Sequence, residues 1–246
     1  MRTSDIAGRR ILVTRAAEDA ERWADRLRRL GAFPILLPCL DIITIANAEI
    51  ERGLRAALAE ASWLVLSARR AVEAVARLAG PVLPPAVRVA VVGPSTARAA
   101  AEWLGRVDLV ATESSARGLA RALLARLDGN DHAAAHVVVA GAANGRTDVE
   151  VALAAAGIRV VRVDLYATVA AAPAPRKLDL AAEGIDAVLL ASPTAAEGLV
   201  NRALVPPHVH VITIGPTTSA AAAAVGLTVR AEARRPDLAG MLEALP

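Results

Sequence analysis

The sequence predicts an α/β protein with parallel sheets, because short aliphatic runs alternate with segments of helical periodicity along the whole chain. The runs are continuously apolar rather than alternating, which is typical of strands whose two faces are both covered by helices. Hydrophobic residues make up 55% of the 246 residues and aromatic residues only 2%, so the predicted core is almost wholly aliphatic.

The first strand–helix–strand step shows the pattern clearly. Residues 11–15 (ILVTR) predict a buried strand, and apolar side chains recur every three or four residues from Ala20 to Leu30. Gly31 ends this predicted helix, and residues 34–38 (PILLP) predict the next strand. Further strands are predicted at residues 63–67, 87–92, 107–111, 136–140, 158–163, 186–191, 209–214 and 227–231. A helix is expected between each strand and the next, including one around residues 177–182.

An internal repeat divides these strands into two sets of five. The aligned segments are residues 9–43 with 135–169, 63–75 with 187–199, and 89–100 with 210–221, at offsets of about 126, 124 and 122 residues. Five strands are the size of a flavodoxin-like doubly wound sheet. We therefore predict two flavodoxin-like doubly wound parallel-sheet domains that arose by duplication.

Two extended segments fall at equivalent places in the repeats, at residues 39–45 and 164–175, and they predict a two-stranded linker between the domains. If the chain crosses at both points, one domain is continuous and the other is closed from both termini. The predicted limits are a discontinuous domain of residues 1–38 plus 171–246, a continuous domain of residues 44–164, and linkers 39–43 and 165–170.

Composition and motifs exclude several classes of function. The 28 Lys and Arg residues are scattered among 25 Asp and Glu residues, and aromatic residues are scarce, so we expect no nucleic-acid partner. The sequence contains no dinucleotide, P-loop or α/β-hydrolase signature, and we expect no cofactor. The single cysteine, Cys39, and the absence of a long apolar segment predict a cytoplasmic protein with no disulfide and no membrane span. Four scattered histidines do not suggest a metal site.

Several predicted strands end in turns rich in small and hydroxyl residues. In the turns GPST (93–96) and GPTT (215–218), Gly ends the strand and Pro presets the first helical turn. Such a helix N-terminus can hold a carboxylate or phosphate, although helix capping alone is the simpler interpretation. The candidate ligand-binding residues in turns of this kind are Arg15, Ser67, Thr96, Gly141, Ser192, Pro193, Thr194, Gly215, Thr217 and Thr218.

The order of these motifs resembles the uroporphyrinogen-III synthase family. The segments that carry the resemblance are ILVTRAAEDAERWADRLRRLGAFPILLP, CLDI, WLVLSARRAVEA, VAVVGPSTARA, ESSARGL, VRVDLYATV, VLLASPTAAEGL and IGPTTSAA. The resemblance implies two α/β domains with the substrate in the cleft between them. It also implies a cofactor-free reaction that cyclises hydroxymethylbilane, inverts ring D and releases water, giving uroporphyrinogen III for haem, sirohaem and corrinoid biosynthesis.

The resemblance also assigns roles to individual residues. The only tyrosine of the chain, Tyr166, matches the hydroxyl that assists departure of the leaving group, while the alternative is a linker residue that fills a gap. Thr96 and Thr218 match second-hydroxyl positions, and the turn from Ser192 to Thr194 matches a serine–proline turn. Arg15 matches a common arginine that either pairs with a substrate carboxylate or forms an internal salt bridge.

One position departs from the family pattern. Where the family often has Thr-Ser, this chain has Ser67 followed by Ala68, which lacks a hydroxyl group. The departure leaves open an alternative function, a non-catalytic two-domain relative that binds a tetrapyrrole or small molecule in a regulatory role. Otherwise we expect a monomeric enzyme whose partner is the small-molecule polycarboxylate hydroxymethylbilane.

Overall fold

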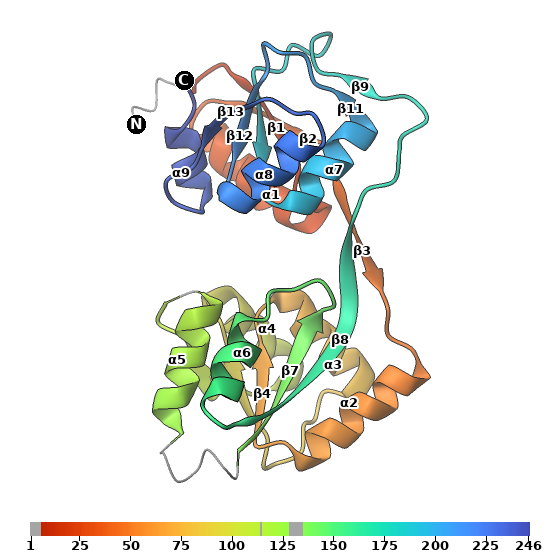
Figure 1. The fold of residues 1–246 in the computed structure, drawn as a ribbon, viewed down its shortest axis with the longest axis vertical. Helices are drawn as coiled ribbons and strands as arrows, with labels where there is room; N and C mark the ends of the chain where they lie inside the picture. Colours follow the sequence, from red (N-terminus) through yellow and green to blue (C-terminus); the bar gives the residue numbers. More distant parts are fainter. Residues whose placement is uncertain (1–5, 114, 128–134) are drawn as a thin grey trace. The chain divides into compact units, whose positions relative to one another are not determined.

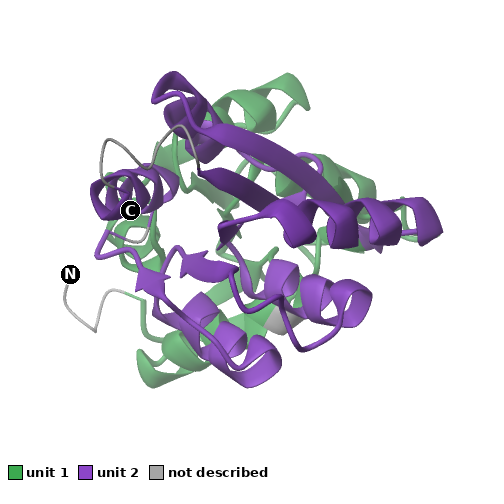
Figure 2. Cartoon of the chain, turned by 90° about the horizontal axis from the view of Figure 1, so that it is seen from below, with its two compact units in different colours: residues 1–42, 168–246 green, residues 43–167 purple. Residues whose placement is uncertain are grey.

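The chain divides into two compact units, one of residues 1–42 and 168–246 and the other of residues 43–167 (Figure 2). The computed structural model describes residues 6–113, 115–127 and 135–246, and Figure 1 shows the helices and strands that they form. In both units, aliphatic strands pair in parallel and helices connect most of them. This arrangement confirms the predicted class, a mixed α/β fold with parallel sheets.

The first unit is built on a five-stranded sheet. Its elements are β1 (Arg10–Val13), α1 (Ala17–Arg29), β2 (Phe33–Leu36), β9 (Leu178–Asp179), β10 (Ala187–Leu190), α7 (Pro193–Arg202), β11 (Ala203–Leu204), β12 (His210–Thr213), α8 (Pro216–Ala224), β13 (Val229–Glu232) and α9 (Leu238–Glu243). The sheet order is β13-β12-β10-β1-β2, and every neighbouring pair in it is parallel. The short strands β9 and β11 form a separate parallel pair.

Helices cover both faces of this sheet. Leu12 of β1 belongs to a buried cluster with Leu199 of α7, whereas its neighbour Ile11 belongs to a second cluster with Leu27 of α1 and Met241 of α9. Successive side chains of a strand point to opposite faces, so each face of β1 meets a different pair of helices. This double coverage explains why the strands are aliphatic at consecutive positions.

The second sheet has six strands. The elements that belong to it or pack on it are β3 (Leu40–Thr44), α2 (Ala48–Glu60), β4 (Trp63–Leu66), α3 (Arg69–Ala79), β5 (Arg88–Val91), α4 (Pro94–Leu104), β6 (Leu109–Val110), α5 (Ala116–Arg126), β7 (His136–Ala142), α6 (Asp148–Ala155) and β8 (Arg159–Ala170). The order is β3-β8-β7-β4-β5-β6. Trp63 and Val65 of β4 pack with Leu123 of α5 and Leu153 of α6, and the remaining residues of β4 are equally buried.

The chain passes between the units through β3 and β8, which are neighbours in the second sheet. Ala171 N donates to Cys39 O at 3.1 Å, and Ile45 N donates to Leu165 O at 3.3 Å. Residue numbers therefore rise along one segment and fall along the other, so the two paired segments run antiparallel. They include the segments 39–43 and 165–170 that the sequence predicts as linkers.

The prediction of a helix around residues 177–182 is wrong, because the structure has a short strand and turns there. Leu178 and Asp179 form β9, and a series of turns follows. The carboxylate of Asp179 accepts hydrogen bonds from Ala181 N at 2.9 Å and Ala182 N at 3.3 Å. An aspartate that binds the backbone just after itself favours a turn over a continuing helix. The pairing of β9 with β11 also holds this segment extended.

Two helices in different units begin with the same local structure. The N-cap side chain of Ser115 accepts from Gly118 N at 3.0 Å in α5, and that of Asp237 accepts from Gly240 N at 2.7 Å in α9. A Cβ atom at either glycine would lie 2.3 Å from the backbone carbonyl oxygen two residues before the N-cap. The two motifs lie 122 residues apart, which is the offset of the last segment in the sequence repeat.

Cys39 is fully buried in the apolar cluster that lies against α7. Burial raises the pKa of its thiol from 9.0 to about 12, and the charge of Arg202 opposes this shift only in part. Between about pH 9 and pH 12 the unfolded chain therefore binds fewer protons than the folded protein. Stability should fall as pH rises through this window, by at most about 1.4 kcal/mol per pH unit.

The measurement is the free energy of unfolding in urea for wild type and Cys39→Ala at a series of pH values from 8 to 11. We expect the difference between wild type and variant to shift in favour of the variant above about pH 9, the ordinary thiol pKa. If the free energies of unfolding of the two proteins change with pH in the same way, the pKa of the Cys39 thiol is not raised by folding.

Candidate functional site

The carboxyl ends of β1, β10 and β12 lie side by side at one edge of the first sheet, because these strands are parallel neighbours. The turns that follow them carry Arg15, Ser192 and Gly215. From β1 the chain continues to β2 on one side, whereas β10 leads to β12 and β13 on the other. Doubly wound sheets bind ligands outside the carboxyl ends of the strands where the order reverses in this way. The topology thus gathers the candidates of this unit at one edge.

The GPTT turn leaves a helix N-terminus open to a ligand. Gly215 is the N-cap of α8, and this helix receives no hydrogen bond from a capping side chain. Pro216 has no N–H and Thr218 N donates to Gly215 O at 3.0 Å, so within the described residues the Thr217 N–H is the first-turn donor left for an anion. The helix dipole favours negative charge there. Thr217 is exposed, whereas Thr218 is only 2% exposed. Of the two threonines, Thr217 is the one that a ligand can reach.

The GPST turn of the second unit has the same arrangement. Gly93 is the N-cap of α4 and supplies no side-chain cap, Ser95 is exposed, and Thr96 is 5% exposed. Sequence reasoning placed both Ser95 and Thr96 in this turn but selected only Thr96 as a site residue. Because Ser95 lies 122 residues before Thr217, the offset of the repeat could have identified it as the matching exposed hydroxyl.

The serine–proline turn is already capped. Ser192 is the N-cap of α7, and its hydroxyl accepts from Ala195 N at 3.2 Å, with Pro193 at the first helical position. Thr194 is partly buried in the same turn. This serine therefore holds the helix in the structure, and it would have to share its hydroxyl with any ligand.

Ala68 occupies the equivalent N-cap position in α3 and makes no capping bond. It has the extended backbone that an N-cap serine adopts, with φ −147° and ψ 150°, against −160° and 157° at Ser192. We expect Ser192→Ala to lower the free energy of unfolding by about 1 kcal/mol and Ala68→Ser to raise it by a similar amount. Urea titration of the two variants measures both effects, and changes of the same sign would contradict this comparison.

Arg15 is engaged within its own unit. Its guanidinium lies 3.4 Å from the carboxylate of Asp19 and 4.9 Å from the ring centre of Trp23. The Nε atom is buried and has no hydrogen-bond partner among the described residues. The internal salt bridge considered from the sequence is thus present, and the side chain is held beside the edge that carries Ser192.

In the second unit, β4 and β7 are parallel neighbours, so Ser67 and Gly141 also come to one edge. Ser67 is exposed, and Gly141 lies where the register between β7 and β8 shifts. The strand order again reverses at this pair, because β4 leads to β5 and β6 while β7 leads to β8. The two units therefore present turns of the same kind at equivalent points of their sheets.

Tyr166 lies on β8 opposite Ala142, the residue that follows Gly141. Its carbonyl accepts from Ala143 N at 2.7 Å, which fixes the strand beside the turn after β7. The side chain is 8% exposed, and burial raises the pKa of the phenol above its ordinary value of 10.0, while the positive charge of Arg70 opposes the shift. The phenol is therefore protonated at neutral pH.

Sequence reasoning did not select Arg70 as a site residue. It stands in the first turn of α3, three residues after Ser67, and its charge acts on the Tyr166 hydroxyl. The pair Arg69-Arg70, which begins two residues after the strand-end Ser67, was the available signal.

The described residues contain no group of three or more His, Cys, Asp or Glu side chains placed to hold a metal ion. None of their helices combines the length and apolar character that a membrane span requires.

Comparison with known proteins decides the family. The sequence model of the family described as uroporphyrinogen-III synthase HemD matches residues 21–243, nearly the whole chain. The chain belongs to the uroporphyrinogen-III synthase family. A curated relative named uroporphyrinogen-III synthase, from Synechococcus elongatus, is 36% identical over 126 residues, which are 48% of this chain and 47% of that protein. A porphyrin biosynthesis protein HemD from Ruminiclostridium josui is 29% identical over 68 residues, 28% of this chain and 14% of that protein.

Solved structures from this family share the fold of the chain. The uroporphyrinogen-III synthetase of Helicobacter pylori aligns with a TM-score of 0.61 at 12% identity, covering 96% of this chain and 97% of that one. A mutant uroporphyrinogen III synthase from Thermus thermophilus aligns with a TM-score of 0.55 at 17% identity, covering 96% of both chains. The alignments to the curated relatives span less than half of those proteins' own lengths.

Proposed function

We propose that this protein is a uroporphyrinogen-III synthase, which cyclises hydroxymethylbilane with inversion of ring D and releases water in tetrapyrrole biosynthesis. The observation that carries the proposal is the family match over residues 21–243. The geometry supports it, because both sheets present helix N-termini suited to a polycarboxylate at the edges where doubly wound folds bind ligands.

The substrate carries eight carboxylates, and we assign its contacts to turns of both units. The open N-termini of α4 and α8, with the exposed hydroxyls of Ser95 and Thr217, bind carboxylates directly. Thr96 and Thr218 are buried in the same turns and pack under the exposed residues. The other proposed substrate-binding residues are Arg15, Ser67, Gly141, Ser192, Pro193, Thr194 and Gly215.

Tyr166 is the proposed proton donor. The hydroxyl of the substrate's terminal hydroxymethyl group accepts a proton and leaves as water when its C–O bond breaks, and a cationic azafulvene remains. A neutral phenol is required for this step, and the raised pKa of Tyr166 keeps it neutral. The charge of Arg70 stabilises the phenolate that forms after the transfer. A proton released by the pyrrole after ring closure restores the phenol.

The two units are proposed to be flavodoxin-like domains produced by duplication. If each strand is matched to its repeat partner, the order β13-β12-β10-β1-β2 corresponds to β6-β5-β4-β7-β8 strand for strand. The matched capping motifs at Ser115 and Asp237 support the same origin. Each unit then combines the first part of one repeat with the second part of the other. The domain limits, the monomeric state and the cytoplasmic location remain predictions.

The alternative is a relative that binds a tetrapyrrole without catalysing its closure, and the uncapped Ala68 is the observation that favours it. An assay coupled to a deaminase that produces hydroxymethylbilane separates the two functions. A synthase yields the type III isomer. A binding protein would retain tetrapyrrole tightly while the product stayed type I, the isomer that forms spontaneously.

A further inference from the structure

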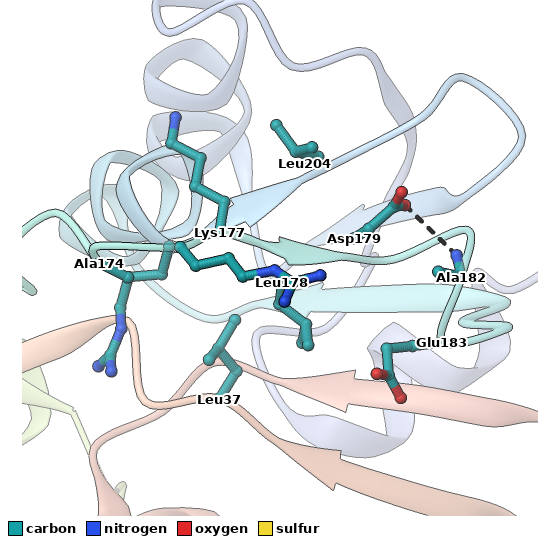
Figure 3. A pocket seen from close by; sticks show the side chains of 10 residues that line it. Leu37, Ala174, Lys177, Leu178, Asp179, Ala182, Glu183 and Leu204 are labelled. Atoms are coloured by element: carbon teal, nitrogen blue, oxygen red, sulfur yellow. Dashed lines mark hydrogen bonds between the residues drawn. The ribbon is translucent and has the colours of Figure 1, made fainter.

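A cavity of about 840 Å³ lies in the first unit, and its lining includes none of the residues of the turns at Ser192 and Gly215. It is lined by Leu37, Ala174, Arg176, Lys177, Leu178, Asp179, Ala182, Glu183, Arg202 and Leu204. Figure 3 shows that these side chains come mainly from the segment around β9, with Leu37 facing them from the end of β2. The volume lies within the range of small-molecule sites, roughly 300–1,000 Å³.

The positive charges of this cavity are uncompensated, whereas its negative charges are engaged. Arg176 and Lys177 make no hydrogen bond or ion pair within the described part of the chain. Arg202 donates from Nη1 to Pro38 O at 2.8 Å and makes no ion pair there. By contrast, the Asp179 carboxylate caps the turn after β9, and the Glu183 carboxylate lies 3.8 Å from the Arg10 guanidinium. The cavity therefore favours an anion.

Its apolar lining distinguishes the cavity from a site for a simple inorganic ion. Leu37, Leu178 and Leu204 line it from three different segments. Leu178 and Leu37 lie on the same side of the β9–β11 pair in Figure 3, whereas Leu204, which pairs with Asp179, lies on the other side. Leu204 is 53% exposed, which is unusual for a large aliphatic side chain of this protein. A ligand with an apolar body would cover Leu37 and Leu178 while its charged groups met the basic side chains of the lining.

We propose that this cavity is a binding site for a small organic polycarboxylate with an apolar body, distinct from the turns assigned to the substrate. Arg176 and Lys177 supply its principal charge contacts, and Arg202 supplies a planar fork already fixed by its bond to Pro38. The proposal does not depend on synthase activity, because binding can be measured in the absence of turnover.

Benzene-1,3,5-tricarboxylate is the probe, because it joins a flat apolar ring to three carboxylates. Its binding is measured by calorimetry with wild type, with R176A/K177A, and with R26A/R77A. R26A/R77A removes two exposed arginines that make no ion pair in the described structure. The two double variants therefore lose the same amount of positive charge. We expect binding at least tenfold weaker in R176A/K177A and unchanged in R26A/R77A. An equal loss of binding in both variants would show that affinity depends only on net charge, and it would contradict the proposed site.

A second measurement locates the probe. Lys177 is the only lysine, so an amine-acylating reagent modifies this side chain and the N-terminus alone. The probe should slow acylation of Lys177 at least severalfold, measured by peptide mapping, while the trimethyl ester of the probe and inorganic phosphate do not. Protection by phosphate alone would indicate a simple ion site. Binding without protection would place the probe elsewhere, for example at the turns of Ser95 and Thr217, and either result contradicts the proposal.

Discussion

Replacing Gly198 with alanine should destabilise the protein by about 3 kcal/mol or more, because the new methyl group has no space. A Cβ atom at this position of α7 would lie 1.6 Å from Cys39 O and 3.1 Å from Ala171 N. These two atoms form the hydrogen bond at one end of the antiparallel pair of segments that pass between the units, residues 39–45 and 165–171. The added methyl group can be accommodated only if the backbone at Cys39 and Ala171 moves, because the nearest atoms in its way are backbone atoms rather than a flexible side chain. The segments around these two residues would then lose their packing on α7.

Gly53→Ala is the matched control. Gly53 also lies within a helix, α2, but it is exposed and a Cβ atom there would meet nothing within 4 Å. Alanine should stabilise this helix by up to about 1 kcal/mol. Urea unfolding followed by circular dichroism measures both variants. Similar stabilities for Gly198→Ala and Gly53→Ala would refute the close packing of α7 against the Cys39 carbonyl.

Tyr166→Phe should lower turnover by about 100-fold while leaving the fold intact, because it removes only the proposed proton donor. The remaining activity would come from the substrate contacts proposed above. Since the pKa of Tyr166 is raised above 10.0, the wild-type donor should remain protonated throughout the neutral range. Loss of activity caused by its ionisation should begin only above about pH 10 and be absent from the variant.

Thr228→Val is the control for this experiment. It also deletes one hydroxyl group, but Thr228 is exposed and immediately precedes β13, at the end of the strand opposite to the candidate turns. The measurement is the initial rate of type III product at saturating substrate, with unfolding midpoints recorded for each protein. If Tyr166→Phe keeps the wild-type rate, Tyr166 is not the donor.

The strands and their turns were predictable because both depend on local chemistry. Continuous apolar runs such as WLVL (63–66) have few alternatives in a chain of this composition. The Gly-Pro sequences at Gly93 and Gly215 start helices in the structure, as their chemistry dictates. The helix expected at residues 177–182 failed because side-chain bonding by Asp179 and pairing with β11 outweighed a weak helical pattern.

The details of the candidate site depend on burial, which the sequence pattern does not report. Thr217 and Thr218 are chemically identical, and only the packing of α8 shows that the first is exposed and the second is buried. The role of Arg70 required the fold as well, because β8 brings Tyr166 near it from almost 100 residues away along the chain. Likewise, Gly198 is an ordinary helical glycine until Cys39 O is placed against it.

The isomer composition of the product tests the central claim most directly. Hydroxymethylbilane is supplied at a constant rate by a deaminase, increasing amounts of the purified protein are added, and the two uroporphyrinogen isomers are separated after oxidation. We predict that the type III fraction rises with the amount of protein until type I is no longer detected. Type I product alone at every protein concentration would contradict the proposed function.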